Sequence, residues 1–340
     1  MELDLNLIWF VLLGVLIAGY MVLDGFDLGV GVLHPLARTD HERRVSINSI
    51  GPLWDGNEVW LVTFVGALFA AFPEAYATVF SGFYNAFMLL LLALIFRAVS
   101  IEFRSKIQHR VWRSICDWSF FGASLIIPLI IGVAGANIML GMPLDERGEF
   151  IGSTVDLLTP YALLVGLFTV ALVMMHGAIY LCLKTEGAYR RRMRRWAWHC
   201  FGVFLTLYLL TTIFTLMMLP QATANFHDHP WGVVVVVLGV LAIANIPRCL
   251  HHGRMGQAFA SSGVAILVFV CLLAAATFPN IVASAPRPEH SLTIYSAASS
   301  PTTLTIMLII AGLGMPFVIG YTVVIYWTFR GKVRLDEHSY

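Results

Sequence analysis

Long apolar stretches alternate with short polar connections along almost the whole chain. Each stretch is about 20 residues long, the length of an α-helix that crosses the hydrocarbon core of a bilayer. A transmembrane barrel would instead show apolar alternation over about ten residues at a time. The pattern therefore predicts an all-α, polytopic membrane protein. Nine membrane segments are expected, with bounds of 7–33, 50–72, 76–97, 117–140, 157–183, 197–219, 231–248, 259–279 and 302–329.

Composition supports this fold class. Hydrophobic residues make up 59% of the 340 residues and charged residues only 12%, whereas water-soluble domains carry about 25% charged residues. The formal net charge of +1 suggests no nucleic-acid partner. We expect a single membrane domain over 1–340, with the first four helices in 1–140 and the last five in 141–340.

The positions of lysine and arginine predict the orientation in the membrane. One set of alternate connections holds 19 of the 21 Lys and Arg residues, and the other set holds only Arg147 and Arg287. Because cytoplasmic connections carry an excess of basic residues, the N-terminus is expected outside and the C-terminus in the cytoplasm. This assignment requires an odd number of crossings and leaves no Lys or Arg within a membrane core.

Four carboxylates interrupt the first two hydrophobic segments. Asp24 and Asp27 lie in the first segment, and Asp55 and Glu58 lie at the start of the second. Within each pair the residues are three apart and share one helical face. The apolar part of the second segment, 59–72, is only 14 residues long, or about 21 Å at 1.5 Å per residue. Crossing about 30 Å of hydrocarbon therefore requires its acids to lie at or inside the membrane boundary.

Acids in a bilayer are costly, so they are functional candidates by default. Carboxylates removed from water and close to one another can exchange protons near neutral pH. We therefore predict a proton-conducting role, first for Asp55 and Asp27 and second for Asp24 and Glu58. The alternative is that these acids cap helix ends or form ion pairs with basic residues of the first cytoplasmic connection, which are Arg38, Arg43 and Arg44.

Other polar residues in the segments have weaker functional interpretations. His34 lies seven residues after Asp27 on the same face, near the cytoplasmic edge, where it would belong to a proton entrance. His176 lies deep in the fifth segment. It could ligate a haem, but such a histidine more often forms a hydrogen bond with a neighbouring helix. Asp117, at the expected start of the fourth segment, would stabilise the helix dipole.

Small and aromatic residues lie beside the acids. Gly25 and Gly29 form a GxxxG pattern, which is common where membrane helices pack closely. Trp54 and Trp60 fit an aromatic belt at the membrane interface, and Trp54 also precedes Asp55 directly.

The five cysteines predict neither disulfides nor a metal site. Four lie at expected cytoplasmic helix ends and the fifth, Cys271, lies within the eighth segment. No cysteine is in an outer connection, where disulfides would form. No Cys/His spacing suggests zinc, and no CxxCH sequence suggests attached haem. We expect no metal ligands in this chain.

The motifs of the first 140 residues resemble subunit II of the cytochrome bd-type terminal quinol oxidases, a family that includes cyanide-insensitive oxidases. The stretches that carry the resemblance are Asp24-Gly25-Phe26-Asp27-Leu28-Gly29, Glu42-Arg43-Arg44, Ile47-Asn48-Ser49-Ile50, Trp54-Asp55-Gly56-Asn57-Glu58-Val59-Trp60-Leu61, Gly66-Ala67-Leu68-Phe69-Ala70-Ala71, Phe80-Ser81-Gly82-Phe83-Tyr84, Phe96-Arg97, Phe103-Arg104-Ser105-Lys106, Trp112-Arg113 and Asp117-Trp118. The second half agrees in length, helix count and topology.

The resemblance implies a multi-pass subunit of the bacterial cytoplasmic membrane that pairs with a haem-carrying subunit I. In that family, subunit I holds the quinol site, two haems b and one haem d, and oxygen is reduced to water there. Small single-helix subunits accompany some complexes, and some members hold a structural quinone in subunit II. The chain itself is expected to bind no haem and to contact membrane lipid.

The family also implies roles for the acids of the first two helices. They are expected to face subunit I and to deliver cytoplasmic protons toward it, with Asp55 the leading candidate and Asp27 the second. Trp54 and His34 would lie near this pathway or contact a quinone.

Two alternatives remain at this point. Membrane carboxylates also suit a proton-coupled secondary transporter, although the acids here are concentrated in the first two helices and have no counterpart in the second half. A purely structural subunit is the other alternative, in which the acids only form pairs and pack.

Overall fold

Long helices form most of the structure, which is a computed structural model describing residues 4–223, 225–226 and 230–335. The α-helices are α1 (Leu5–Leu23), α2 (Gly25–Leu33), α3 (Asp40–Ile50), α4 (Trp54–Ala71), α5 (Pro73–Gly82), α6 (Tyr84–Phe103), α7 (Arg110–Leu140), α8 (Pro160–Lys184), α9 (Gly187–Met218), α11 (Val233–His252), α12 (Met255–Thr277) and α13 (Pro301–Thr328). Strands β1 (Asn280–Val282) and β2 (Leu292–Thr293) form an antiparallel pair, and four short 3-10 helices lie at His34–Leu36, Pro220–Thr223, Pro230–Gly232 and Pro288–His290.

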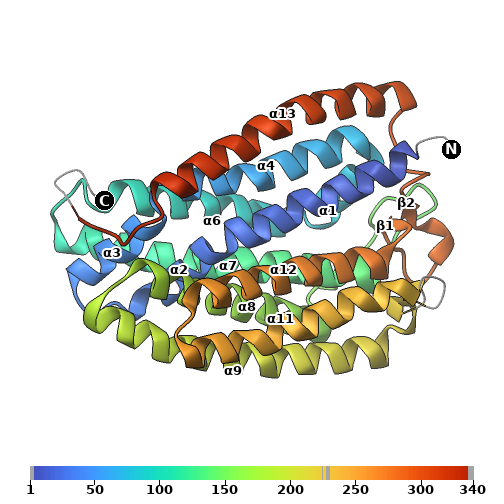
Figure 1. The fold of residues 1–340 in the computed structure, drawn as a ribbon. Coiled ribbons are helices and arrows are strands. Elements are labelled where there is room, and N and C mark those ends of the chain that lie inside the picture. The colour runs from blue at the N-terminus through green and yellow to red at the C-terminus, as the bar shows by residue number, and fades with distance from the viewer. Residues whose placement is uncertain (1–3, 224, 227–229, 336–340) are drawn as a thin grey trace.

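Eight stretches of the described chain are helical, long and apolar enough to cross a membrane. They correspond to eight of the nine predicted segments. The remaining segment, 50–72, is α4, whose first turns carry Asp55, Asn57 and Glu58 and are too polar to meet the same criterion. In Figure 1, α4 nevertheless runs lengthwise beside α1, and α1 begins at the opposite end of the bundle from the end of α13. These directions agree with an odd number of crossings.

Two of the predicted segments are interrupted in the structure. The first is divided at Asp24, which ends α1 and precedes α2. The segment predicted at 76–97 is wrong as a single helix: Phe83 separates α5 from α6, and α6 continues six residues further, to Phe103. This extension places Arg97 inside a membrane helix and not in a connection.

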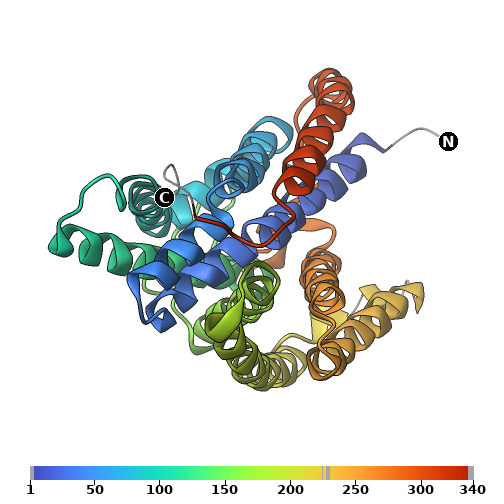
Figure 2. The ribbon, with the colours of Figure 1, turned by 60° about the vertical axis from the view of Figure 1, so that its left-hand side comes forward.

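Helix α8 lies at the centre of the bundle. In the apolar stretch of this helix, 72% of the residues are buried inside the protein, a larger share than in any other described helix that could span a membrane. It packs against α2, α7, α9 and α12, and Figures 1 and 2 show it enclosed by the other helices. Tyr180 of α8 stacks on Phe26 of α2 with ring centroids 4.1 Å apart. Helix α8 is therefore the scaffold on which α2 and its acid are held.

A glycine contact sets the close approach of α2 and α8. A Cβ added to Gly29 would lie 1.9 Å from the carbonyl oxygen of Val173, and a Cβ on Gly177 would lie 2.4 Å from the backbone of Gly29. At Gly25 the nearest atom would be 3.6 Å away, an ordinary contact. Of the GxxxG pair, Gly29 is therefore the residue that determines helix packing.

Helix α13 lies on the outside of the bundle against α1 and α4 (Figure 2). Leu304 is its buried residue. Hydrogen bonds hold it at both ends: Trp9 Nε1 donates to the Leu304 carbonyl at 3.0 Å, and the Tyr326 hydroxyl donates to Asn57 Oδ1 at 3.0 Å. Lys184 Nζ also donates to the carbonyl of Phe329, directly after the helix. Beyond α13, Lys332 Nζ donates to the Thr185 carbonyl at 2.9 Å and so ties the chain to the end of α8.

The Gly29→Ala substitution should destabilise the protein by about 1–3 kcal/mol, because the added methyl forces α2 away from the backbone of α8. Gly25→Ala and Gly14→Ala are matched controls, since their added Cβ atoms meet an ordinary contact and open space. Thermal unfolding of the purified protein in detergent measures the effect. Equal melting temperatures for the Gly29 and Gly14 variants would contradict it.

Candidate functional site

Asp24, one of the acids of the first two predicted segments, meets Arg97 in the interior. The Arg97 side chain, fully buried on α6, donates from Nη1 to Asp24 Oδ2 at 2.8 Å and from Nη2 to Asp24 Oδ1. Both side chains have no exposed surface. The expectation that no Lys or Arg lies in a membrane core is therefore wrong, because α6 extends beyond its predicted end and carries Arg97 inside.

This pairing also identifies the partner of Asp24. The alternative drawn from the sequence paired the acids with Arg38, Arg43 or Arg44, but the structure joins Asp24 to Arg97, 73 residues away in sequence. In this bidentate contact each carboxylate oxygen accepts a hydrogen bond from the guanidinium group. The two opposite charges thereby compensate each other where no water is available to solvate them. Asp24 is thus held as one half of a neutral ion pair at the joint between α1 and α2.

Asp27 has a different environment. It is fully buried on α2, and its Oδ2 accepts a hydrogen bond of 2.7 Å from Asn57 Nδ2 of α4. Its Oδ1 is buried and has no hydrogen-bond partner within the described residues. Although they are three residues apart, Asp24 and Asp27 point to different helices. Unlike Asp24, Asp27 therefore has no direct contact with a cation among the described residues.

The acids of α4 lie nearer the surface. Asp55 is exposed and Glu58 is half-buried. Asp55 shares its helical face with Val59, Val62 and Phe69, of which Val62 is 67% exposed and Phe69 58% exposed. Helix α4 therefore presents a carboxylate at one end of an otherwise apolar, uncovered strip.

A second ionic cluster lies where α3, α6 and α7 approach one another. The Asp117 carboxylate accepts from Arg43 Nη1 at 2.7 Å and from Arg104 Nε at 2.6 Å, and Asp117 Oδ1 lies 2.7 Å from His34 Nε2. Burial lowers the pKa of Arg104, but hydrogen bonds and charge from Asp117 and Asp40 outweigh it and raise that pKa above its ordinary value. Arg104 is consequently a permanent cation.

The structure corrects the expectation for Asp117 and places His34. Helix α7 begins at Arg110, so Asp117 lies two turns inside the helix and serves as a hub for ion pairs instead of an N-terminal charge. His34 is buried and contacts Asp117, whereas Asp27 hydrogen-bonds to α4. The two residues therefore belong to different polar clusters.

His176 is engaged by neighbouring helices. Its Nδ1 lies 2.6 Å from Ser262 Oγ of α12, its Nε2 lies 3.2 Å from the Val22 carbonyl of α1, and its ring stacks on Phe259. Hydrogen bonding across helices is confirmed as the role of this histidine.

An apolar cavity of about 510 Å³ lies between α1, α7, α8, α9, α11 and α12. Its walls include Phe168 and Phe269, and its polar groups are hydroxyls. Tyr161 and Thr215 hydrogen-bond to each other at 2.7 Å, and the buried Thr211 hydroxyl has no partner within the described chain. Trp54 and His34 are not among the lining residues.

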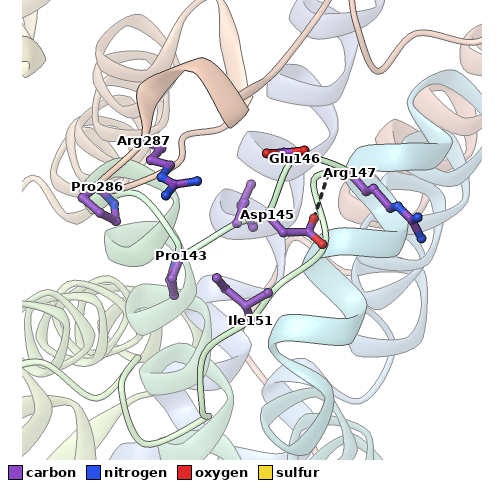
Figure 3. A pocket seen from close by; sticks show the side chains of 8 residues that line it. Pro143, Asp145, Glu146, Arg147, Ile151, Pro286 and Arg287 are labelled. Atoms are coloured by element: carbon purple, nitrogen blue, oxygen red, sulfur yellow. Dashed lines mark hydrogen bonds between the residues drawn. The ribbon is translucent and has the colours of Figure 1, made fainter.

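A second pocket, also about 510 Å³, lies at the end of the bundle that holds β1 and β2. Figure 3 shows Asp145, Glu146 and Arg147 on one connection, with Pro286 and Arg287 across from them. Asp145 Oδ1 accepts from the Arg147 backbone nitrogen at 2.9 Å, so this acid orders its own turn. Among the described residues, no group of three or more His, Cys, Asp or Glu side chains is arranged to hold a metal ion.

Three residues that organise the site are not identified by the sequence. Arg97 is expected in a connection, and Asn57 and Tyr326 carry no charge that would mark them as functional candidates. Asn57 lies inside the acidic motif, which was the available signal. Tyr326 is 269 residues away from Asn57 and becomes its neighbour only in the folded chain.

Comparisons with known proteins relate the chain to one family. The family model described as cytochrome bd terminal oxidase subunit II matches residues 5–329. The chain is 36% identical to the cytochrome bd-I ubiquinol oxidase subunit 2 of Escherichia coli (strain K12), with 98% of this chain and 96% of the relative covered. It is also 36% identical to the cytochrome bd ubiquinol oxidase subunit 2 of Bacillus subtilis (strain 168), with 98% of each covered.

One solved structure has the same fold. A chain in the structure of the bd oxidase from Geobacillus thermodenitrificans superposes with a TM-score of 0.78, covering 96% of this chain and 99% of that chain at 18% identity. At this identity the likeness concerns the fold alone.

Replacing Arg97 by Met should destabilise the protein by about 3–5 kcal/mol, because Asp24 is then buried without its cation. The double variant Asp24→Leu/Arg97→Met should recover most of this loss, since it removes both charges. Arg191→Met, at an exposed position of α9, is the control. Thermal unfolding of the purified protein tests the pair, and a double variant no more stable than the single one would contradict it.

Proposed function

The chain belongs to the cytochrome bd terminal oxidase subunit II family, and we propose that it is the haem-free accessory subunit that delivers cytoplasmic protons to its partner. Family membership makes it a subunit of a quinol oxidase complex in the bacterial inner membrane, together with subunit I. In this proposal the N-terminus faces outward, the end of the bundle near α3 faces the cytoplasm, and the reaction reduces oxygen to water with quinol. Small single-helix subunits would complete the complex.

The exposed carboxylate of α4 carries this proposal. Helix α4 has 18 residues, or about 27 Å, so the full helix is needed to cross about 30 Å of hydrocarbon. A charged Asp55 on the same face as Val59 and Val62 would be costly against lipid. Contact with a partner protein removes that cost. We therefore assign this face of α4 to the contact with subunit I and Asp55 to the transfer of protons across it.

The other acids take graded roles in the pathway. Glu58 is half-buried one turn from Asp55, and Asp27 is fully buried behind it on α2. Asp24 interacts with Asp27, but its pairing with Arg97 makes it a fixed charge and not a carrier. The proton pathway thus consists of Asp55, Glu58 and Asp27, with Asp24 as the charge that holds Arg97 beside them. Trp54, buried at the start of α4, packs next to this route.

The surroundings of His176, the histidine deep in an apolar segment, support a haem-free chain. A haem iron binds an imidazole nitrogen that has no other partner, and both nitrogens of His176 contact other groups. The haems of the complex, two haems b and one haem d, are therefore assigned to subunit I.

Family membership favours the oxidase over the secondary transporter. A purely structural role is favoured by one observation, the buried Asp24–Arg97 pair, which satisfies its own charges without any transfer. That observation concerns Asp24 alone. It leaves Asp27 with an unpartnered oxygen and Asp55 on the surface.

We also propose that the apolar cavity holds a structural quinone. Its volume of about 510 Å³ lies within the range of small-molecule sites, which are largely apolar with a few polar groups that fix orientation. A quinone carbonyl would accept a hydrogen bond from the Thr211 hydroxyl, and Phe168 and Phe269 would contact the ring. Since Trp54 and His34 do not line this cavity, the proposal removes them as quinone contacts.

The Asp55→Asn variant of the assembled complex should lose about tenfold or more of its oxygen consumption, equivalent to a barrier increase of about 1.4 kcal/mol. The amide keeps the size of the side chain but cannot release a proton. Glu74→Gln, an exposed carboxylate on α5, is the control. Oxygen uptake with quinol and the haem absorption spectrum are both recorded. Unchanged uptake at normal haem content would refute the relay role of Asp55.

The Thr211→Val variant should retain quinone about tenfold more weakly, as expected for a lost hydrogen bond worth about 1.4 kcal/mol. Quinone extracted per purified complex is compared with that of the parent and of Thr206→Val, an exposed position on the same helix. Equal quinone content in all three complexes would remove Thr211 as its contact.

A further inference from the structure

Asn57 occupies the centre of a buried hydrogen-bond chain that joins four helices, α1, α2, α4 and α13. It is 2% exposed on α4, and its Nδ2 donates to the Leu23 carbonyl at 3.0 Å and to Asp27 Oδ2 at 2.7 Å. Its Oδ1 accepts from the Tyr326 hydroxyl of α13 at 3.0 Å. The asparagine therefore uses both amide protons and one carbonyl lone pair in the protein interior.

The orientation of this amide follows from its neighbours. A rotation that exchanged Nδ2 and Oδ1 would bring the amide oxygen against the Leu23 carbonyl and Asp27 Oδ2, which both act as acceptors. Two favourable contacts would then become repulsive in a medium without water. Tyr326 reinforces the observed orientation because its O–H is a donor to Oδ1. Asn57 thus presents an N–H to Asp27 Oδ2.

A fixed donor makes the two oxygens of Asp27 unequal. A carbonyl oxygen is a better acceptor than a hydroxyl oxygen, so the N–H of Asn57 favours Oδ2 as the carbonyl of the protonated acid. The proton is then left to Oδ1, the oxygen that is buried without a hydrogen-bond partner in the described chain. The charged groups that act on Asp27 are Asp24, Arg97 and Glu58, and none of them is hydrogen-bonded to it.

We propose that Asn57 is a positioning residue that directs the proton of Asp27 to Oδ1. Held by Tyr326 and the Leu23 carbonyl, it keeps Oδ2 as a hydrogen-bond acceptor and leaves Oδ1 as the oxygen that takes up and releases the proton. This role rests on the proposed function, in which Asp27 carries protons. It also links α13, otherwise on the outside of the bundle, to the acid pathway through one hydroxyl group.

Infrared spectroscopy of the assembled oxidase tests the assignment. The carbonyl stretch of protonated Asp27 is recorded at a pH low enough to populate the acid and is identified by its loss in Asp27→Asn or its displacement in Asp27→Glu. In Asn57→Leu the band should move to higher wavenumber, because the Oδ2 carbonyl loses its hydrogen bond. In Tyr326→Phe, which keeps the Asn57 amide, a smaller shift in the same direction is expected.

Asn137→Leu is the matched control. Asn137 is also a buried asparagine, 3% exposed, whose Nδ2 donates to the Val133 and Leu157 carbonyls on the opposite side of the fold from Asp27. Its substitution should leave the Asp27 band unmoved. A band that does not shift in Asn57→Leu would overturn the proposal, because the proton would then lie on Oδ2. The absence of any Asp27 band at low pH would overturn it as well.

Oxygen uptake of the same variants separates this inference from the proposed function. Slower uptake in Asn57→Leu at normal haem content, together with the shifted band, supports both. If Asn57→Leu shifts the band but Asp27→Asn consumes oxygen at the normal rate, the assignment of the proton to Oδ1 stands and Asp27 is removed from the pathway.

Discussion

The buried pair of Asp24 and Arg97 is the interaction on which the arrangement of acids depends. A lone carboxylate or guanidinium inside a membrane protein carries a large desolvation cost. Here the two groups neutralise each other at the joint between α1 and α2, where both side chains are fully buried. The pair draws α6 onto this joint and allows the chain to keep further acids nearby. Without it, the interior would hold carboxylates with no cation among them.

The remaining acids lie in environments that become progressively more open. Asp27 is buried with one oxygen held by Asn57, Glu58 is half-buried, and Asp55 is exposed. This gradient from the interior to the surface of α4 is what a proton pathway to a partner subunit requires. All of these side chains are carboxylates, and they differ in their burial and contacts.

Tight packing keeps these groups in place. Helix α8 is the most enclosed of the described spans, and the approach of α2 to it is set by Gly29 and Gly177. On the other side, α13 contributes a single hydroxyl to the acid cluster while most of its surface stays uncovered. The apolar cavity is built from different helices, apart from α1 and α8, so the proposed quinone site and the proposed proton pathway lie in separate parts of the fold.

Hydropathy alone determined the fold class and most helix positions, because a bilayer admits only long apolar helices with satisfied backbones. The acidic motifs could also be recognised from the sequence, because charged residues are rare in apolar membrane segments. The division of the segment 76–97 at Phe83 could not be predicted, because no proline or charged residue marks the break. Nor could the sequence decide the partners of the acids: Arg97 was expected in a connection, and Asn57 and Tyr326 carry no charge that would mark them as partners. Only the tertiary structure brought these residues together, because a hydrogen bond or ion pair depends on a few ångströms between helices that are distant in sequence.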